Sequence, residues 1–228
     1  MLRKTASTHA NGVLLLLRVN ASNTSVEGIG SAFLAHRAGY LVTCAHTFNL
    51  TDELGIAVPF RGEGFVPMSL KECDVAKVKV AQYDAVHDVA LLKLPDGTTA
   101  MMPQLSFMSD RDVQLGASAA CIGYPFCSRG LHTRHISSAT VSAKVLSENG
   151  TKQFQLDATI HDGNSGGPLI DVQTNRVFGI VSGRFAPNNG FAGVAVGGFI
   201  PGTDSAIAYG TSIAYALDLL RAEGLDVQ

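Results

Sequence analysis

The stretch DGNSGGPLI, residues 162–170, places one serine among three glycines and ahead of an apolar run. Glycine on both sides of the serine permits backbone angles and close approaches that a Cβ atom would block. Such a turn can hold a hydroxyl exposed at a fixed place, with neighbouring N–H groups converging on one point. A serine hydroxyl is a weak nucleophile, so the stretch predicts catalysis only if a histidine base and an orienting acid accompany it. Without them it is a polar turn between strands.

The composition describes a chain that can bury a core. Its 228 residues are 46% hydrophobic and 16% charged, which suits one large domain or two smaller units that share an interface. The formal net charge is −2 and the 17 Lys and Arg residues are scattered. The sequence therefore carries no electrostatic footprint for nucleic acid or an anionic membrane. No segment approaches the ~18 apolar residues that cross a bilayer, so we expect no membrane and no nucleic-acid partner.

The amino-terminal residues lack the pattern of an export signal. A charged start is followed by a polar run at 5–9, and the apolar run 13–17 is only five residues long before Arg18. An export signal needs ~7–15 apolar residues and a small-residue cleavage site. We therefore interpret 13–17 as a buried first strand and expect a cytoplasmic protein.

The cysteine spacing is unlike that of a zinc site, because no CxxC occurs among Cys44, Cys73, Cys121 and Cys127. Without an export signal these thiols are expected to be reduced. Cys121 and Cys127 are close enough in sequence to pair under oxidising conditions, and the sequence leaves that open.

Short apolar and β-branched runs separated by turn signals predict an all-β protein. Residues 30–35 and 40–44 form a predicted hairpin, and 89–94 is a continuous apolar run that predicts a deeply buried strand. The pattern weakens over 97–114, which we interpret as a linker between two halves. A second series of strands starts near residue 117.

Only the end of the chain predicts a helix. Ser212 can cap it, the helix runs to about Glu223, and Gly224 can stop it. Before it, residues 183–205 are rich in Gly, Pro and Asn and predict an exposed loop.

His46 is the strongest candidate base among the seven histidines. It follows the apolar strand 40–45, so a rigid element can hold its ring in place. Rigid placement matters because geometry decides before pKa whether a base is competent.

Asp88 is the strongest candidate for the orienting acid. It precedes the buried strand 89–94, where a carboxylate is costly unless it accepts a hydrogen bond. A histidine Nδ1–H is a suitable donor. Asp84 and Asp96 are rivals in turn-like surroundings, and we assign the neighbouring His87 to a surface or rim role.

The order His46, Asp88, Ser165 is the order found in chymotrypsin-type triads. Residues 163–167 also satisfy G-x-S-x-G, the nucleophile elbow of α/β-hydrolases. That fold needs its histidine after the serine, and the last histidine here is His161. It also needs alternating strands and helices, which this sequence lacks, so we reject it.

These motifs resemble those of trypsin-like (chymotrypsin-fold) serine peptidases, and most of all the HtrA/Deg-type protease domain. The resemblance extends over about residues 12 to 223. The matching segments are GSAF at 30–33, YLVTCAH at 40–46, DVALLKL at 88–94, QLDA at 155–158, GNSGGPL at 163–169, VFGIVS at 177–182 and the helix after AYG at 208–210.

The resemblance implies an all-β fold of two antiparallel six-stranded β-barrels with a C-terminal α-helix and the site in the cleft between the barrels. The whole of 1–228 would be a single peptidase domain. Its parts would be an N-terminal barrel at about 12–100, the linker at about 97–114, a C-terminal barrel at about 115–210 and the helix at about 212–223.

The resemblance also implies a role for each candidate site residue. Ser165 would attack the scissile carbonyl, His46 would take and return the proton, and Asp88 would fix the histidine tautomer. The turn Gly163, Asn164 and Ser165 would form the oxyanion hole through the N–H groups of its first and last residues. No metal or organic cofactor is implied.

The same resemblance implies which residues bind substrate. Ser182 would lie near Asp88, and the backbone of Val181, Ser182, Gly183 and Arg184 would pair with the substrate as an added strand. Thr159, six residues before Ser165, would lie at the floor of the specificity pocket. Thr159 is uncharged and Arg184 would lie near the pocket mouth, so we predict cleavage after small or medium apolar residues.

Two departures from the family pattern lead to further expectations. Digestive-type members carry an aspartate before the serine that ion-pairs with a newly cut N-terminus, whereas this chain has Asn164. We therefore expect no such zymogen switch. HtrA-type members usually continue into a PDZ domain, and this sequence stops at Gln228, so we expect it to lack that peptide-sensing module.

The sequence thus predicts a serine endopeptidase acting on peptide or protein substrates. Two alternatives stay open. One is a latent or partner-activated binding or sensor module with a protease fold, and the other is an esterase with the same chemistry. An activating protein partner is possible, and the oligomeric state is not predicted.

Overall fold

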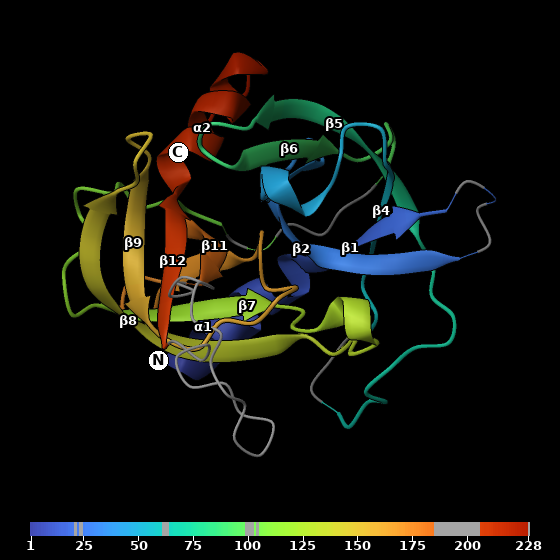
Figure 1. Ribbon diagram of the computed structural model, residues 1–228, viewed down its shortest axis with the longest axis horizontal. Coiled ribbons are helices and arrows are strands. Elements are labelled where there is room, and N and C mark those ends of the chain that lie inside the picture. Colours follow the sequence, from blue (N-terminus) through green and yellow to red (C-terminus); the bar gives the residue numbers. More distant parts are fainter. Residues whose placement is uncertain are drawn as a thin grey trace, which may run out of the picture.

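The computed structural model describes residues 1–20, 22, 25–60, 64–98, 103, 105–184 and 206–227. Within these residues the chain forms two closed six-stranded antiparallel barrels and a C-terminal helix. The barrels lie side by side in Figure 1. The fold class predicted from the sequence is confirmed.

Each barrel closes its sheet with the same kind of strand order. The first barrel follows β1-β2-β3-β6-β5-β4 and the second β10-β11-β12-β9-β8-β7. The strands of the first are β1 Val13–Val19, β2 Val26–His36, β3 Tyr40–Thr43, β4 Glu53–Ala57, β5 Ala76–Asp84 and β6 Val89–Lys93. Those of the second are β7 Ser118–Gly123, β8 His135–Leu146, β9 Lys152–Asp157, β10 Pro168–Asp171, β11 Val177–Arg184 and β12 Ile207–Ser212. The helices are α1 Leu2–His9 and α2 Ile213–Ala222, with the short 3-10 turns η1 Ala10–Gly12, η2 Ala45–Thr47 and η3 Cys127–Arg129.

Strand β1 shows why its sequence is continuously apolar. Leu14 and Leu16 belong to a cluster formed only by first-barrel residues. Leu15 and Leu17 belong to a second cluster that includes residues of the other barrel. Because successive side chains of a strand point to opposite faces, a strand buried on both faces needs apolar residues at every position.

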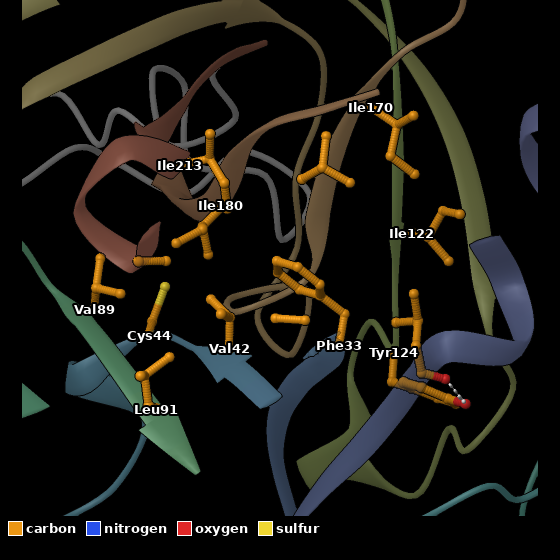
Figure 2. Packing of buried hydrophobic residues seen from close by; sticks show 14 of the residues in the cluster. Phe33, Val42, Cys44, Val89, Leu91, Ile122, Tyr124, Ile170, Ile180 and Ile213 are labelled. Carbon is orange, nitrogen blue, oxygen red and sulfur yellow. Dashed lines mark hydrogen bonds between the residues drawn. The ribbon is translucent and has the colours of Figure 1, made fainter. Parts of the chain in front are cut away.

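The second cluster holds the two barrels together. Figure 2 shows Phe33 and Val42 of the first barrel facing Ile122 and Ile170 of the second, with Ile213 of α2 completing the cluster. All five are buried. Complete burial of each such side chain stabilises the folded state by about 1.5–3 kcal/mol, so apolar packing supplies most of the free energy that holds the two halves together.

Helix α2 forms as predicted. Ser212 Oγ accepts a hydrogen bond from Ala214 N–H at 3.3 Å, and Gly224 follows the helix with φ +74°. The Glu223 carboxylate accepts hydrogen bonds from Tyr40 OH (2.8 Å) and from Gln82 Nε2. These bonds hold the end of α2 against the first barrel and lower the pKa of Glu223, although partial burial opposes them.

Helix α1 was not predicted from the sequence. Its buried residues are Thr5 and His9, and His9 Nε2 bonds to Asn175 O at 3.1 Å. Since polar side chains occupy the buried positions, the sequence shows no apolar helical period. The helix lies beside β7 of the second barrel (Figure 1).

Two predicted irregular segments are described only in part. Of the linker predicted over 97–114, residues 99–102 and 104 lie outside the described residues. Within the described part of the linker, Phe107 forms an isolated β-bridge with Val177 of β11. Of the loop predicted over 183–205, residues 185–205 lie outside the described residues. The domain boundaries stay a prediction. Among the described residues, no helix has the length and apolar character needed to cross a membrane.

Candidate active site

His46 and Asp88 lie in direct contact. His46 lies in η2, directly after β3, and its Nδ1 is 2.7 Å from Asp88 Oδ2. The His46 backbone N–H donates to Asp88 Oδ1 at 2.9 Å. A carboxylate only accepts hydrogen bonds, so Nδ1 carries the proton and the lone pair of a neutral ring lies on Nε2. The side chain of His46 is 50% exposed and that of Asp88 is 29% exposed, so the pair faces solvent on one side.

The rival carboxylates do not contact His46. Asp84 lies at the other end of the turn between β5 and β6, with its Oδ2 2.6 Å from His87 Nδ1. Asp96 has a fully exposed side chain, 3.9 Å from Lys93 Nζ. His87, predicted to lie on the surface or rim, is partly buried with its ring stacked on Tyr215.

All three glycines of the turn that carries Ser165 lack room for a Cβ atom, and two of them also have positive φ. Gly163 has φ +95°, and a Cβ atom there would lie 2.3 Å from Tyr124 O. Gly166 has φ +88°, and a Cβ atom there would lie 2.1 Å from Ser31 O and 2.3 Å from Thr43 Oγ1. Both positions combine left-handed backbone angles with close backbone approach, which only glycine satisfies. The turn is therefore fixed on both sides of the serine.

The peptide before Gly163 has a defined orientation. Asp162 O accepts a hydrogen bond from Phe126 N–H at 2.6 Å. Since the C=O and N–H of a trans peptide point in opposite directions, the Gly163 N–H points away from Phe126. In the described part of the chain, neither Gly163 N–H nor Ser165 N–H has a hydrogen-bond acceptor.

Asn164 differs from its two neighbours. Its N–H donates to His161 O at 3.1 Å, so it is not available to a ligand. The sequence placed Asn164 in the turn of the predicted oxyanion hole but named only the N–H groups of Gly163 and Ser165 as donors, and the bond of Asn164 N–H to His161 O agrees with that choice. The buried side chain of Asn164 packs against Gly123, where a Cβ atom would lie 2.7 Å from Asn164 Oδ1.

Ser31 of the first barrel holds the serine turn of the second. Its Oγ donates to Gly163 O at 2.7 Å, and its N–H donates to Ser165 O at 2.9 Å. The same Oγ accepts from Tyr124 N–H at 3.0 Å. Ser31 is completely buried and joins both barrels at the site. The sequence motif GSAF contains Ser31 but gives no signal for these contacts.

Cys44 makes a second connection between the barrels. Its Sγ donates to Val181 O at 3.2 Å, and the same carbonyl accepts from Gly166 N–H at 2.8 Å. Cys44 lies two residues before His46, and Gly166 directly follows Ser165. The histidine segment and the serine turn are therefore fastened to one carbonyl group.

Cys44, His46 and Asp88 also offer three possible metal-ligand atoms within 4.8 Å of one another. Burial, reinforced by the negative charge of Asp88, raises the pKa of the Cys44 thiol well above its usual range. A metal ligand must be a thiolate, and His46 Nδ1 is already bonded to Asp88. The arrangement therefore favours a hydrogen-bonded His–Asp pair over a metal site.

In the described part of the chain, the Ser165 hydroxyl is not hydrogen-bonded to the His46–Asp88 pair. Among the hydrogen bonds of the described residues, none joins Ser165 Oγ to His46, and Oγ instead donates to Ser182 O at 3.4 Å. This bond is long, and rotation about one side-chain bond redirects the hydroxyl. In structures without substrate, nucleophile–base hydrogen bonds are often long or unformed.

The predicted substrate-binding residues have different surroundings. Thr159 is exposed. Val181 is buried, and its N–H donates to Gly167 O. Its C=O already accepts from Cys44 and Gly166, so neither backbone group is free to bind a substrate. Ser182 Oγ donates to Tyr209 O at 3.1 Å rather than to Asp88. Gly183 and Arg184 pair with Tyr209 and Ala208 of the neighbouring strand β12. The side chain of Arg184 lies outside the described part of the structure.

A cavity of about 570 Å³ lies away from these residues, on the outer face of the first barrel. No candidate site residue lines it. Its walls come from β1, β2, segment 70–77 and His132.

The two closed six-stranded barrels match the chymotrypsin-like fold. The sequence matches the family described as trypsin-like peptidase domain over residues 30–180, and the chain belongs to this family. It is 32% identical over 169 residues to the probable periplasmic serine endoprotease DegP-like of Pseudomonas fluorescens, covering 74% of this chain and 32% of that protein. It is 30% identical over 181 residues to the magnetosome formation protease MamE of Magnetospirillum gryphiswaldense, covering 77% of this chain and 21% of that one.

Solved structures give the same fold. The HtrA-type protease AlgW with decapeptide superposes with a TM-score of 0.72 at 19% identity, covering 97% of this chain and 67% of that chain. The serine endoprotease from Yersinia pestis superposes with a TM-score of 0.66 at 18% identity, covering 98% and 68%. The predicted resemblance to HtrA/Deg-type protease domains is confirmed. The chain spans about a third or less of the length of the two curated relatives, which contain more than this fold.

Proposed function

We propose that this chain is a serine endopeptidase in which Ser165 is the nucleophile, His46 the general base and Asp88 the residue that orients the histidine. The contact between His46 Nδ1 and Asp88 Oδ2 at 2.7 Å carries the proposal. It presents Nε2 as the free basic nitrogen. The carbonyl of Val181 accepts from both Cys44 and Gly166, which joins the histidine segment to the serine turn and supports the proposal that the two side chains act together.

The reaction then follows from this geometry. Ser165 Oγ bonds to the scissile carbonyl carbon while its proton moves to His46 Nε2, and Asp88 stabilises the resulting imidazolium. The carbonyl oxygen becomes an oxyanion that accepts from Gly163 N–H and Ser165 N–H, and each donor contributes a factor of roughly 10²–10³ to the rate. The proton passes to the leaving amine as the C–N bond breaks. Water then attacks the acyl-enzyme by the same steps, with His46 again as base.

The substrate backbone is proposed to pair with the end of β11. β10 ends its pairing at Pro168 opposite Ile180, whereas β11 continues to Arg184 beside β12. Among the described residues, the other edge of 182–184 therefore has no strand partner. An extended peptide can add to such an edge through main-chain hydrogen bonds. This restricts the predicted substrate strand to Ser182, Gly183 and Arg184.

Cleavage after small or medium apolar residues remains our proposal for specificity, since Thr159 brings no charge to the pocket. A peptide-library digest should show little cleavage after Lys or Arg. Dominant cleavage there would overturn the assignment. The uncharged, buried Asn164 supports the further proposal that the domain needs no N-terminal cleavage to become competent.

One observation favours a second candidate function. Ser165 Oγ donates to Ser182 O instead of His46, as expected for a resting site that a partner must activate. In that case the protein is a latent sensor module until a partner binds. An esterase would share all the chemistry of the peptidase and would turn over esters but not peptides.

Labelling with a fluorophosphonate probe tests the proposal. We expect one probe per chain, bound to Ser165, no labelling of Ser165→Ala and strongly slowed labelling of His46→Ala. Ser142→Ala is the matched control, because Ser142 is an exposed serine of β8 whose hydroxyl donates to Thr140 O at 3.4 Å. Absence of labelling that a cell extract restores would favour the latent module, and labelling of folded Ser165→Ala would refute the assignment.

The compartment remains a prediction. The sequence predicts a cytoplasmic protein, while the name of the DegP-like relative says periplasmic of that protein. Fractionation of cells that express the full chain would decide between them. The substrate is proposed to be a peptide or protein, and the oligomeric state is open.

A further inference from the structure

The turn that carries Asp88 contains a second His–Asp pair. Asp84 Oδ1 accepts from the N–H groups of Val86 and His87, each at 3.0 Å, and Asp84 Oδ2 lies 2.6 Å from His87 Nδ1. Burial raises the pKa of Asp84, but the hydrogen bonds from His87 and Val86 outweigh it, so the pKa of Asp84 is lowered. Asp84 thus closes the turn as an anion bonded to three N–H groups.

The second barrel holds the same turn from outside. Val86 O accepts from Asn149 Nδ2 at 2.7 Å and from Thr151 Oγ1 at 3.3 Å. Both donors come from the turn between β8 and β9. The ring of His87 stacks on Tyr215 of α2, with centroids 3.9 Å apart and planes at 14°. The Tyr215 side chain is itself fixed, because its OH accepts from Lys152 N–H at 2.9 Å.

Asp88 needs such support because its own backbone is unfavourable. It has φ +58°, in the left-handed region that residues other than glycine rarely occupy. Aspartate tolerates this region better than most residues, but the conformation persists only where the surroundings impose it. If the turn relaxed, the carboxylate would lose its two bonds to His46, which set the histidine tautomer and the direction of Nε2.

We propose that Asp84 and His87 are a positioning pair for Asp88. The ring of His87 is clamped between the Asp84 carboxylate and the Tyr215 ring, which fixes the peptide that leads into Asp88. We do not assign His87 as a base, because Tyr215 covers one face of its ring and the turn of the proposed nucleophile is joined to the His46 segment through the Val181 carbonyl. The inference rests on the proposed triad and adds to it residues that act on the reaction without touching substrate.

Two substitutions separate the two contacts of His87. His87→Phe keeps an aromatic ring against Tyr215 and removes the bond to Asp84, while His87→Gln keeps an N–H donor and removes the ring. Asp84→Asn weakens the turn from the other side. We expect His87→Phe and Asp84→Asn to slow fluorophosphonate labelling and lower kcat roughly 10-fold with KM unchanged, as for a displaced catalytic group. His87→Gln should recover part of the rate.

His36→Phe is the matched control. His36 is the last residue of β2, is partly buried, and its Nδ1 accepts from Ala38 N–H in the following hairpin turn at 3.1 Å. This turn connects β2 to β3 and is not the turn that carries Asp88. Substitution of His36 should therefore cost similar stability and leave the labelling rate unchanged. If His87→Phe does not fold, Tyr215→Leu tests the positioning role through the other contact of the ring, because it removes the stacking and leaves the bonds from His87 to Asp84 in place.

A measurement without turnover completes the test. The His46 Nδ1–H bonded to Asp88 should give a low-field proton NMR signal in the full chain, assigned by its loss in His46→Gln. We expect this signal to broaden in His87→Phe and Asp84→Asn and to persist in His36→Phe. Unchanged signal and unchanged labelling in the first two variants would overturn the positioning role. A wild-type chain that never labels, yet loses the signal in His87→Phe, would refute the peptidase proposal and leave the positioning role standing.

Discussion

Gly163→Ala is expected to damage the proposed oxyanion hole more than it damages the fold. The added Cβ would lie 2.3 Å from Tyr124 O, 3.0 Å from Cys127 Sγ and 3.1 Å from Phe126 N. An ordinary contact would require the Gly163 backbone to move by about 1 Å. The Gly163 N–H, which has no acceptor among the described residues, would move with it.

Two effects add to the cost in stability. Placing alanine at φ +95° costs about 1–2 kcal/mol, and forcing a methyl group against fixed backbone costs about 1–3 kcal/mol more. Gly116→Ala isolates the first effect, because Gly116 has φ +81° and nothing lies within 4 Å of its Cβ position. We therefore expect the free energy of unfolding to fall by about 1–2 kcal/mol in Gly116→Ala and by about 2–5 kcal/mol in Gly163→Ala.

The assay compares the two variants at a temperature where both are folded. Urea unfolding gives the stability, and the rate of fluorophosphonate labelling gives the reactivity of Ser165. Loss of one oxyanion donor should slow labelling by roughly 10²–10³-fold in Gly163→Ala, with little change in Gly116→Ala. Equal labelling rates in the two folded variants would show that Gly163 N–H is not a donor to the oxyanion, and the assignment would be refuted.

Three further predictions concern single groups. Burial lowers the pKa of His9, although the bond to Asn175 O opposes this shift. The contribution of neutral His9 to stability is therefore complete above the pKa of the unfolded chain, ~6.5, and falls as the pH drops below it. Thermal unfolding from about pH 8 to about pH 5 should show this fall in the wild type and less of it in His9→Gln. Tyr124→Phe removes a buried hydrogen bond from the Tyr124 hydroxyl, whose pKa burial raises to about 12, to Val13 O at 3.2 Å. Figure 2 draws this bond as a dashed line. The substitution should lower the free energy of unfolding, measured in urea, by about 1 kcal/mol and leave the rate of labelling unchanged. Asp88→Asn keeps the shape of the side chain but cannot fix the same His46 tautomer, so labelling should slow by roughly 10³–10⁴-fold while the melting temperature changes little; a rate near wild type would contradict the triad.

The sequence predicts the barrels well because their signals are local. The apolar run of β1, the hairpin of β2 and β3 and the Ser212 cap of α2 each depend on neighbouring residues, and each appears in the structure. Helix α1 escapes prediction because it buries Thr5 and His9 instead of an apolar stripe. Its stability comes from docking on the second barrel, which no local pattern records.

The residues of the candidate site likewise fall into those with a local sequence signal and those whose role depends on contacts distant in sequence. His46 and Asp88 stand out because each adjoins an apolar strand, and the glycines mark Ser165. Ser31 has no such signal, because its partner Gly163 lies 132 residues further along the chain. Cys44 has none either, since a buried cysteine beside a strand end is an ordinary core residue until its bond to Val181 O is seen.

The arrangement of these bonds explains why the proposed activity needs both halves of the chain. The first barrel supplies His46 and Asp88, and the second supplies Ser165. The polar groups that connect the barrels at the site include the Ser31 hydroxyl on Gly163 O, the Ser31 N–H on Ser165 O and the Cys44 thiol on Val181 O. Such bonds contribute only about 0.5–1.5 kcal/mol each, so they can orient the site but cannot hold the barrels together. The apolar cluster of Figure 2 holds the barrels together, which leaves the polar groups free to set the geometry of the site.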